Sequence, residues 1–285
     1  MRYKGRRQSS NVEDRRGMST GKKVGIRGGL FAVVALVFYV LLGGDPQMAL
    51  NFLQSGNEPT EAASSYVPSA HEEELAEFIS VVLADTEDVW HKLFSEMGLQ
   101  YHEPNLVLFS GQVQSACGFS SAATGPFYCP GDDRIYIDLL FLEQLQERLG
   151  AGGDFAIAYI VSHEVGHHVQ KQLGTLGEVH SLQQQVSKNQ YNELTVRLEL
   201  QADFYAGVWA HHAQKMKNIL EEGDLEEAFN AAQAVGDDRL QMQSQGYVVP
   251  DSFTHGTSDQ RMSWFRKGFS TGNLNDGNTF EPDAI

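Results

Sequence analysis

The feature that most constrains the fold is a pair of histidines in residues 156–173, which read AIAYIVSHEVGHHVQKQL. His163 and His167 are four residues apart, so on a helix they lie on one face, one turn apart. Two imidazoles in this arrangement can hold one Zn²⁺, and Glu164 beside the first of them can act as a general base. The apolar run before the motif predicts a buried helix that ends near Gly174.

A third ligand must come from elsewhere in the chain. The metzincin pattern needs a glycine at position 170 and a histidine at position 173, but the sequence has Gln170 and Leu173, which excludes that class. A second predicted helix begins near Asn192 and carries Glu199 and Asp203, which are again four residues apart on one face.

Glu199 is predicted to be the third zinc ligand. Its neighbours are mostly apolar, and an unpaired carboxylate there would be costly. Asp203 is predicted to accept a hydrogen bond from the ring nitrogen of His163 that faces away from the metal, which would fix the tautomer of that histidine. The alternatives are that Glu199 is a solvated surface carboxylate, or that His180 supplies the third ligand.

The rest of the chain predicts an α+β fold that is mainly α-helical with a small β-sheet. Apolar residues at three- and four-residue steps predict a helix over residues 72–97, and Ser69 with Glu72 can form a capping box at its start. Residues 105–110 and 134–138 are short and rich in β-formers, which predicts strands.

The two cysteines, Cys117 and Cys129, lie in a segment rich in glycine, serine and proline between the predicted strands. Because the charge distribution of the chain predicts that this segment lies outside the cytoplasm, we expect one disulfide. A pair of free thiols is the alternative if that topology is wrong. A zinc pair is less favoured, because no second Cys/His pair with zinc-finger spacing accompanies it.

The charge distribution predicts a membrane anchor near the start of the chain. Residues 1–29 hold nine Lys/Arg and two acids, whereas the remainder has a net charge of −23. Thirteen consecutive apolar residues follow the basic segment, within an uncharged stretch from Gly28 to Gly44. This stretch is at the short end for a transmembrane helix. A buried helix and a cleaved signal peptide are the alternatives, but the basic head is long and no cleavage signature follows.

We therefore predict an uncleaved signal-anchor with a cytoplasmic N-terminus, since positive residues stay inside. The predicted organisation is a basic cytoplasmic tail (1–27), a transmembrane segment (28–44), a linker (45–70) and an extracytoplasmic domain (71–285). The net charge of −16 argues against nucleic acid as a partner.

Several strings of the sequence together resemble the bacterial neutral zinc metallopeptidase family, whose members are single-span envelope proteins. The resemblance covers about half of the chain. It implies a zincin-like fold with one Zn²⁺ on His163, His167 and Glu199, and Glu164 as the base. The strings that carry it are Cys117-Gly118, GPFYCP (125–130), RIYID (134–138), HEVGHHVQ (163–170), RLELQAD (197–203) and the segment 254–265.

The C-terminal segment adds His255 as a candidate catalytic residue. Thr254 and His255, with Arg261 a few residues later, are similar to the Thr-His-Pro…Arg segment of membrane-associated zinc proteases related to prenyl-protein processing enzymes; here Gly256 replaces the proline. On this interpretation His255 donates to the developing oxyanion or controls access. Alternatively, it caps or supports the last helix. Tyr191 and Tyr205 are further oxyanion candidates.

The sequence thus predicts a membrane-anchored, zinc-dependent endopeptidase that cleaves peptides or proteins in the periplasm or at the cell surface, through a zinc-bound water activated by Glu164. We expect the substrate to extend along an edge strand, either residues 105–110 or 134–138. A non-catalytic envelope scaffold with the same fold, and an amidase acting on cell-wall peptides, are the alternatives.

Overall fold

The computed structural model describes residues 1–18, 66–121, 125–142 and 153–285. Met1–Arg16 and Pro68–Ile285 form one compact unit, to which all the described helices and strands belong. Its helices are α3 (Ala70–Glu96), α5 (Asp154–Leu173), α6 (Thr175–Leu182), α7 (Lys188–Lys217), α8 (Asp224–Ala234), α9 (Asp237–Gln245) and α10 (Ser258–Thr271), with 3₁₀ turns η3 (Pro250–Ser252) and η4 (Leu274–Gly277). Its strands are β1 (Val12–Asp14), β2 (Asn105–Phe109), β3 (Gln112–Ser115), β4 (Gly118–Ser121), β5 (Phe127–Cys129) and β6 (Arg134–Asp138).

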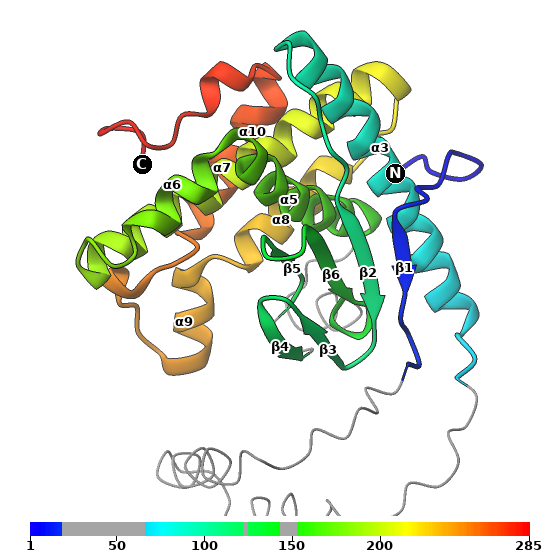
Figure 1. Cartoon of the computed structure of the whole chain (residues 1–285), viewed down its shortest axis with the longest axis horizontal. Helices are drawn as coiled ribbons and strands as arrows, with labels where there is room; N and C mark the ends of the chain where they lie inside the picture. Colours follow the sequence, from blue (N-terminus) through cyan, green and yellow to red (C-terminus); the bar gives the residue numbers. More distant parts are fainter. Residues whose placement is uncertain (19–65, 122–124, 143–152) are drawn as a thin grey trace, which may run out of the picture. The chain divides into compact units, whose positions relative to one another are not determined.

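The main sheet has the strand order β1-β2-β6-β5 (Figure 1). β1, β2 and β6 are parallel, and β5 is antiparallel to β6. Both strands expected from the sequence are present, but they lie inside the sheet, so the expectation that one of them is the edge was wrong. β1 and β5 form the edges instead; each has only three residues, too few for an alternating pattern to reveal.

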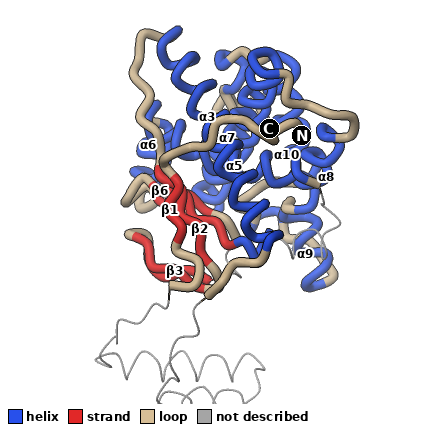
Figure 2. Tube along the Cα trace, turned by 90° about the vertical axis from the view of Figure 1, so that its right-hand side faces the viewer, coloured by secondary structure: helices blue, strands red, loops and turns tan. Residues whose placement is uncertain are grey.

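The two faces of the sheet contact different partners. Leu106, Leu108, Ile135 and Ile137 belong to the main core, which they share with the helices. Val107 and its neighbours on the opposite face form a smaller apolar cluster that includes Val113 of the β3–β4 hairpin. The strands and the helices accordingly occupy separate regions of the molecule in Figure 2. The fold is thus mixed α+β and mainly helical, as predicted.

α3 confirms the helix predicted for residues 72–97. The Ser69 side chain accepts a hydrogen bond from the Glu72 backbone amide, and the Glu72 carboxylate accepts one from the Ser69 amide, so the predicted capping box is present. The helix buries Trp90 completely and contacts both α5 and α7. It therefore supports the two helices that carry the predicted zinc ligands.

The basic N-terminal residues are part of this folded unit. β1 pairs with β2, and Arg6 and Arg7 form ion pairs with Asp85 (2.5 Å) and Glu87 (2.8 Å) of α3. Both of these acids are buried. The domain predicted for residues 71–285 therefore also includes residues 1–16. The sequence interpretation missed this because it assigned the positive charges to membrane topology, whereas several of them neutralise acids far along the chain.

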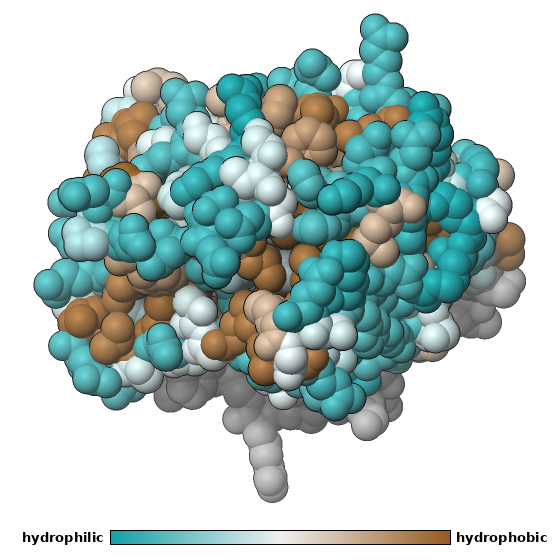
Figure 3. All heavy atoms as spheres, turned by 90° about the horizontal axis from the view of Figure 1, so that it is seen from above, coloured by the Kyte–Doolittle hydropathy of each residue, from teal (hydrophilic) through white to brown (hydrophobic). Residues whose placement is uncertain are grey.

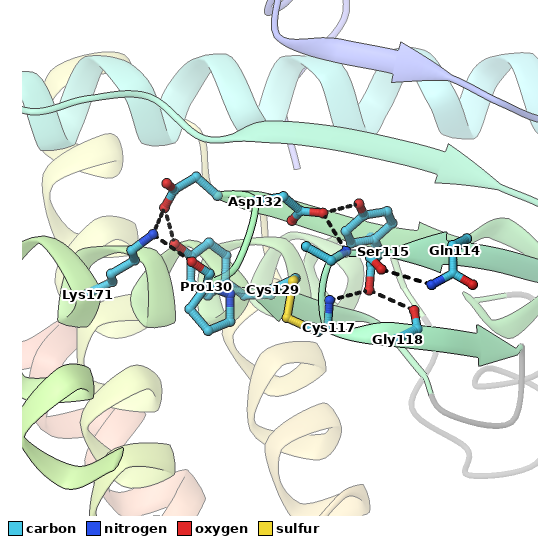
Figure 4. Close-up of a disulfide and its surroundings, with 12 residues drawn as sticks. Gln114, Ser115, Cys117, Gly118, Cys129, Pro130, Asp132 and Lys171 are labelled. Carbon is cyan, nitrogen blue, oxygen red and sulfur yellow. Dashed lines mark hydrogen bonds and ion pairs between the residues drawn. A yellow bond between two sulfur atoms is a disulfide. The ribbon is translucent and has the colours of Figure 1, made fainter. Parts of the chain in front are cut away.

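The predicted disulfide between Cys117 and Cys129 is present and joins the β3–β4 hairpin to the edge strand β5 (Figure 4). A cross-link closing a loop of this length contributes on the order of 3 kcal/mol by the chain-entropy argument. Next to it, Lys171 of α5 donates a hydrogen bond to the Pro130 carbonyl at 2.7 Å. The cross-linked strand is thereby connected to the helix that carries the histidine pair.

Within the described part of the chain, no helix combines the length and the apolar composition that a membrane crossing requires. The predicted transmembrane segment, residues 28–44, and most of the predicted linker lie outside the described residues. The face of the protein seen in Figure 3 is mainly hydrophilic, and its apolar residues lie in small separate groups.

Candidate metal centre

Three side chains from two helices converge at one point. His163 and His167 project from α5, and Glu199 projects from α7. The Nε2 atoms of the two histidines lie 3.2 and 3.3 Å from the two carboxylate oxygens of Glu199. In a tetrahedral zinc site with bonds of 2.0–2.1 Å, ligand atoms are about 3.3 Å apart. Each histidine is at this distance from one oxygen of Glu199, and one ligand atom from each of the three residues lies within 4.8 Å of the others, so the two imidazoles and the carboxylate can hold a zinc ion.

Close packing of α5 against α7 makes this convergence possible. Gly166 lies between the two histidines, and a Cβ atom at this position would come within 3.0 Å of the Ala202 carbonyl oxygen on α7. Any larger residue would push the helices apart and move Glu199 away from the imidazoles. This close approach explains why a glycine occupies one of the two variable positions of the motif.

A buried ionic network orients His163. Its Nδ1 lies 2.8 Å from Oδ1 of Asp203, which is completely buried. The Arg261 guanidinium on α10 donates to both oxygens of Asp203, at 2.8 and 2.9 Å, and the Tyr159 hydroxyl donates to the same carboxylate at 2.5 Å. These contacts hold the imidazole with Nε2 toward the metal position.

His167 is oriented by an amide. Its Nδ1 lies 2.9 Å from Oε1 of Gln170, one turn further along α5. The amide nitrogen of Gln170 in turn donates to the Leu198 carbonyl at 2.7 Å and to the Gln201 side chain at 3.1 Å, both on α7. The orientation of the second histidine is therefore set by the same helix pair that brings Glu199 into place.

The electrostatics of the centre favour a cation. Burial alone would lower the pKa of His163, but the Asp203 and Glu199 carboxylates outweigh it and raise that pKa to about 10. Burial alone would raise the pKa of Glu199, but the two imidazoles hold it well below its ordinary range. The carboxylates around the two imidazoles therefore favour a positive charge at this point, and Zn²⁺ would compete with protons for the same nitrogens.

Glu164 lies beside the first histidine and is largely buried, with 7% of its surface exposed. No described residue donates a hydrogen bond to its carboxylate, so both oxygens can accept a proton or bind a water molecule. This is the condition that a general base must meet.

His255 lies on the loop before α10 and is held by Asp237. One carboxylate oxygen of Asp237 accepts hydrogen bonds from the backbone amides of Thr254 (2.7 Å) and His255 (2.6 Å), and the other lies 3.2 Å from the His255 Nδ1. The hydrogen bond to Asp237 and the charge of Glu199 raise the pKa of His255. The side chain is half exposed. His255 therefore lies close enough to Glu199 to sense its charge, although no contact joins them.

The structure brings most of the predicted site residues together and leaves one of them outside. His163, His167, Glu199 and Asp203 lie together as expected, with Glu164 beside them. His180, the alternative third ligand, is not part of the cluster. The supporting roles of Gln170, Arg261 and Asp237 were not predicted. Gln170 and Arg261 both lie in strings that carry the family resemblance, and Gln170 is three residues after His167 on the same helix, whereas Asp237 left no sequence signal.

Comparisons with known proteins identify relatives and a family. The uncharacterized protein YpfJ of Escherichia coli K12 is 50% identical, over 98% of this chain and 99% of its own. An uncharacterized protein of Mycobacterium tuberculosis H37Rv is 44% identical over 63% of each chain. No solved structure matches the chain. The profile of the family described as "Putative neutral zinc metallopeptidase" matches residues 1–280, and the chain therefore belongs to that family.

Proposed function

We propose that this protein is a zinc-dependent endopeptidase that cleaves peptide bonds. The observation that carries the proposal is the convergence of His163, His167 and Glu199, whose ligand atoms lie within 4.8 Å of one another, next to a carboxylate that accepts no hydrogen bond from a described residue. Structural zinc sites fill all four positions with protein ligands and need no base. Three ligands and a neighbouring glutamate favour catalysis.

The chain's own residues account for the proton movements. A Zn²⁺ held by His163, His167 and Glu199 would supply Lewis acidity and would make a water molecule more acidic, with a pKa of about 7. Glu164 accepts the proton of the attacking water and then gives it to the leaving amine. Asp203 and Gln170 keep the two imidazoles in the tautomers that leave Nε2 free. His255, held by Asp237, is our candidate donor to the developing oxyanion.

The edge strand β5 is our candidate for substrate alignment. Among the described residues it is paired only with β6, and it packs against α5, the helix that carries the histidines. An extended peptide could add to its outer side through main-chain hydrogen bonds. The disulfide at Cys129 would hold this strand in position.

The decisive experiment compares the wild type with Glu164→Gln and with Glu178→Gln, a matched change at an exposed glutamate of α6. We expect one zinc per chain in all three proteins. Casein-type proteolysis should fall about 10²–10⁴-fold only in Glu164→Gln, the range that general acid–base catalysis contributes. A wild type that binds zinc and cleaves no protein or cell-wall peptide would favour a non-catalytic scaffold, and one that binds no zinc would refute the site.

We further propose that residues 28–44 attach the protein to a membrane and that the domain faces an extracytoplasmic compartment. The apolar run supports the attachment, and the disulfide supports an oxidising compartment. A single crossing would place residues 1–16 and 68–285 on opposite sides, which is incompatible with the β1–β2 pairing.

Topology can be measured with membrane-impermeant maleimide on cysteines introduced singly at Lys4 and at Ile285. Labelling of both from outside fits an extracytoplasmic domain with β1 in place. Labelling of Ile285→Cys alone would support a single crossing without β1 in the sheet. Labelling of neither would refute the extracytoplasmic location.

A further inference from the structure

A pocket of about 510 Å³ lies between the first part of α7 and the segment that leads into α10. Asn192 and Val196 of α7 form one side. Phe253, Thr257 and Gln260 line the other side. The Asn192 side chain donates a hydrogen bond to the backbone carbonyl of Asp251 at 2.9 Å, which joins the two walls.

The pocket lies along the same face of α7 that carries Glu199. Asn189, Asn192, Val196, Glu199 and Asp203 follow one another along α7 at steps of three, four, three and four residues, so they share one helix face. Val196, the last of them to line the pocket, is one turn before Glu199, an axial distance of about 4.5 Å.

The residues of the opposite wall are also neighbours in sequence of residues at the metal centre. Phe253 and Thr257 line the pocket on either side of His255 in the sequence, and Gln260 precedes Arg261, which contacts Asp203. A Cβ atom at Gly256 would come within 3.4 Å of atoms in both walls, so this loop packs closely on α7. A peptide bound across the metal centre could therefore place one side chain in the pocket.

The side chains that line the pocket favour one class of ligand. Val196 and Phe253 are buried and give the pocket an apolar interior. Its described lining includes three acids, Glu193, Asp238 and Asp251, and no lysine, arginine or histidine. A side chain that fits this lining has an apolar stem and a positive end.

Two of the three acids form no ion pair with a described residue. Asp238 accepts hydrogen bonds from the amide and the hydroxyl of Ser258, and the Asp251 carboxylate accepts one from Asn189. These donors are uncharged, so they do not neutralise the carboxylates. Glu193 differs, because it forms an ion pair with Arg197 at 3.0 Å. Asp238 and Asp251 are thus the groups available to a cation.

We propose that this pocket is a substrate subsite that selects a lysine or arginine side chain close to the scissile bond. The inference rests on the proposed peptidase function, and it specifies a substrate class for it. Peptides with a basic residue at this position gain both burial of the methylene stem and two carboxylate contacts. A glutamate side chain would be repelled by the same carboxylates.

Binding of amino-acid hydroxamates tests the subsite without requiring turnover. The hydroxamate group anchors each probe on the metal, and only the side chain differs between probes. Calorimetry on the zinc-loaded full chain should show arginine hydroxamate binding about tenfold tighter than norleucine hydroxamate, and glutamate hydroxamate weakest. The double variant Asp238→Asn/Asp251→Asn should lose most of the arginine preference. The asparagine at 238 keeps an oxygen for Ser258, and circular dichroism with zinc content checks folding.

The matched control is Glu222→Gln/Asp283→Asn, which removes the same charge from exposed positions outside the pocket. It should keep the tenfold preference. Equal binding of arginine and norleucine hydroxamates, tighter binding of the glutamate probe, or an equal loss in the control variant would overturn the subsite. If proteins are not cleaved but the arginine preference persists and depends on Asp238 and Asp251, the peptidase function fails and the subsite stands. A protein without zinc affinity overturns both.

Discussion

The metal centre and the N-terminal segment both place arginines against buried carboxylates, but they differ in where the arginine lies. At the metal centre, Arg261 and Asp203 are both buried, with 4% and 0% of their side chains exposed. At the N-terminal segment, Glu87 is 2% exposed whereas Arg7, its partner, is 50% exposed. Burying both ions carries a large desolvation cost, and a half-exposed arginine avoids most of it. The fully buried pair occurs where His163 must be held in one orientation.

The largest difference in stability between the two regions is expected when each arginine is removed in turn, beginning with Arg261. Arg261→Met removes one of the two cationic partners of the buried Asp203 and leaves His163 as the other, so it should lower the free energy of unfolding by about 3 kcal/mol, the low end of the range for breaking a buried ion pair. Arg7→Met, which leaves Glu87 bonded to Ser9 and Asn11, should cost about 1 kcal/mol or less. Urea denaturation of the zinc-free proteins measures both. Equal losses would show that burial of the arginine does not matter.

Replacing Glu87, the buried acid of the second region, tests how firmly the N-terminal segment is attached to α3. Its carboxylate accepts hydrogen bonds from Arg7, Ser9 and Asn11, so it connects residues 7–11 to α3. Glu87→Leu should lower the unfolding free energy by about 1.5–3 kcal/mol, the range for hydrogen bonds to a charged group. It should also expose residues 1–16 to limited proteolysis, with zinc binding retained. Loss of zinc binding would mean that the two regions are not independent.

The same contrast explains how much could be predicted from the sequence. His163, His167, Glu199 and Asp203 are recognisable because both pairs are four residues apart on a helix, so local geometry relates them. Arg261 contacts Asp203 across 58 positions, and Arg7 reaches Glu87 across 80. No periodicity encodes such contacts. The charge of residues 1–16 was visible, but only the pairing of β1 with β2 reveals its partners.

Within the metal centre, the two histidines are oriented by different kinds of hydrogen-bond partner. His163 is oriented by a charged network, whereas His167 is oriented by the neutral amide of Gln170. Gln170→Leu should weaken zinc binding about 10–100-fold, as expected for loss of a group that orients a ligand. Competition with a chromogenic chelator measures the affinity. Gln170→Glu, which restores an acceptor, should recover part of the loss; an unchanged affinity in the leucine variant would refute the role.

The smallest expected effect concerns His255, which lies outside both networks. The hydrogen bond to Asp237 and the charge of Glu199 raise its pKa above the ordinary 6.5, while burial and, to a smaller extent, Arg261 oppose this shift. A raised pKa means that protonated His255 stabilises the loop fully below pH 6.5, and that this stabilisation is lost as pH rises past the raised value. If protonated His255 is the oxyanion donor, kcat/KM falls over the same range. Asp237→Asn should move this alkaline limb to lower pH and reduce activity a few-fold near pH 8, with the zinc affinity unchanged. A limb that stays in place would assign it to another group and leave His255 a structural role on its loop.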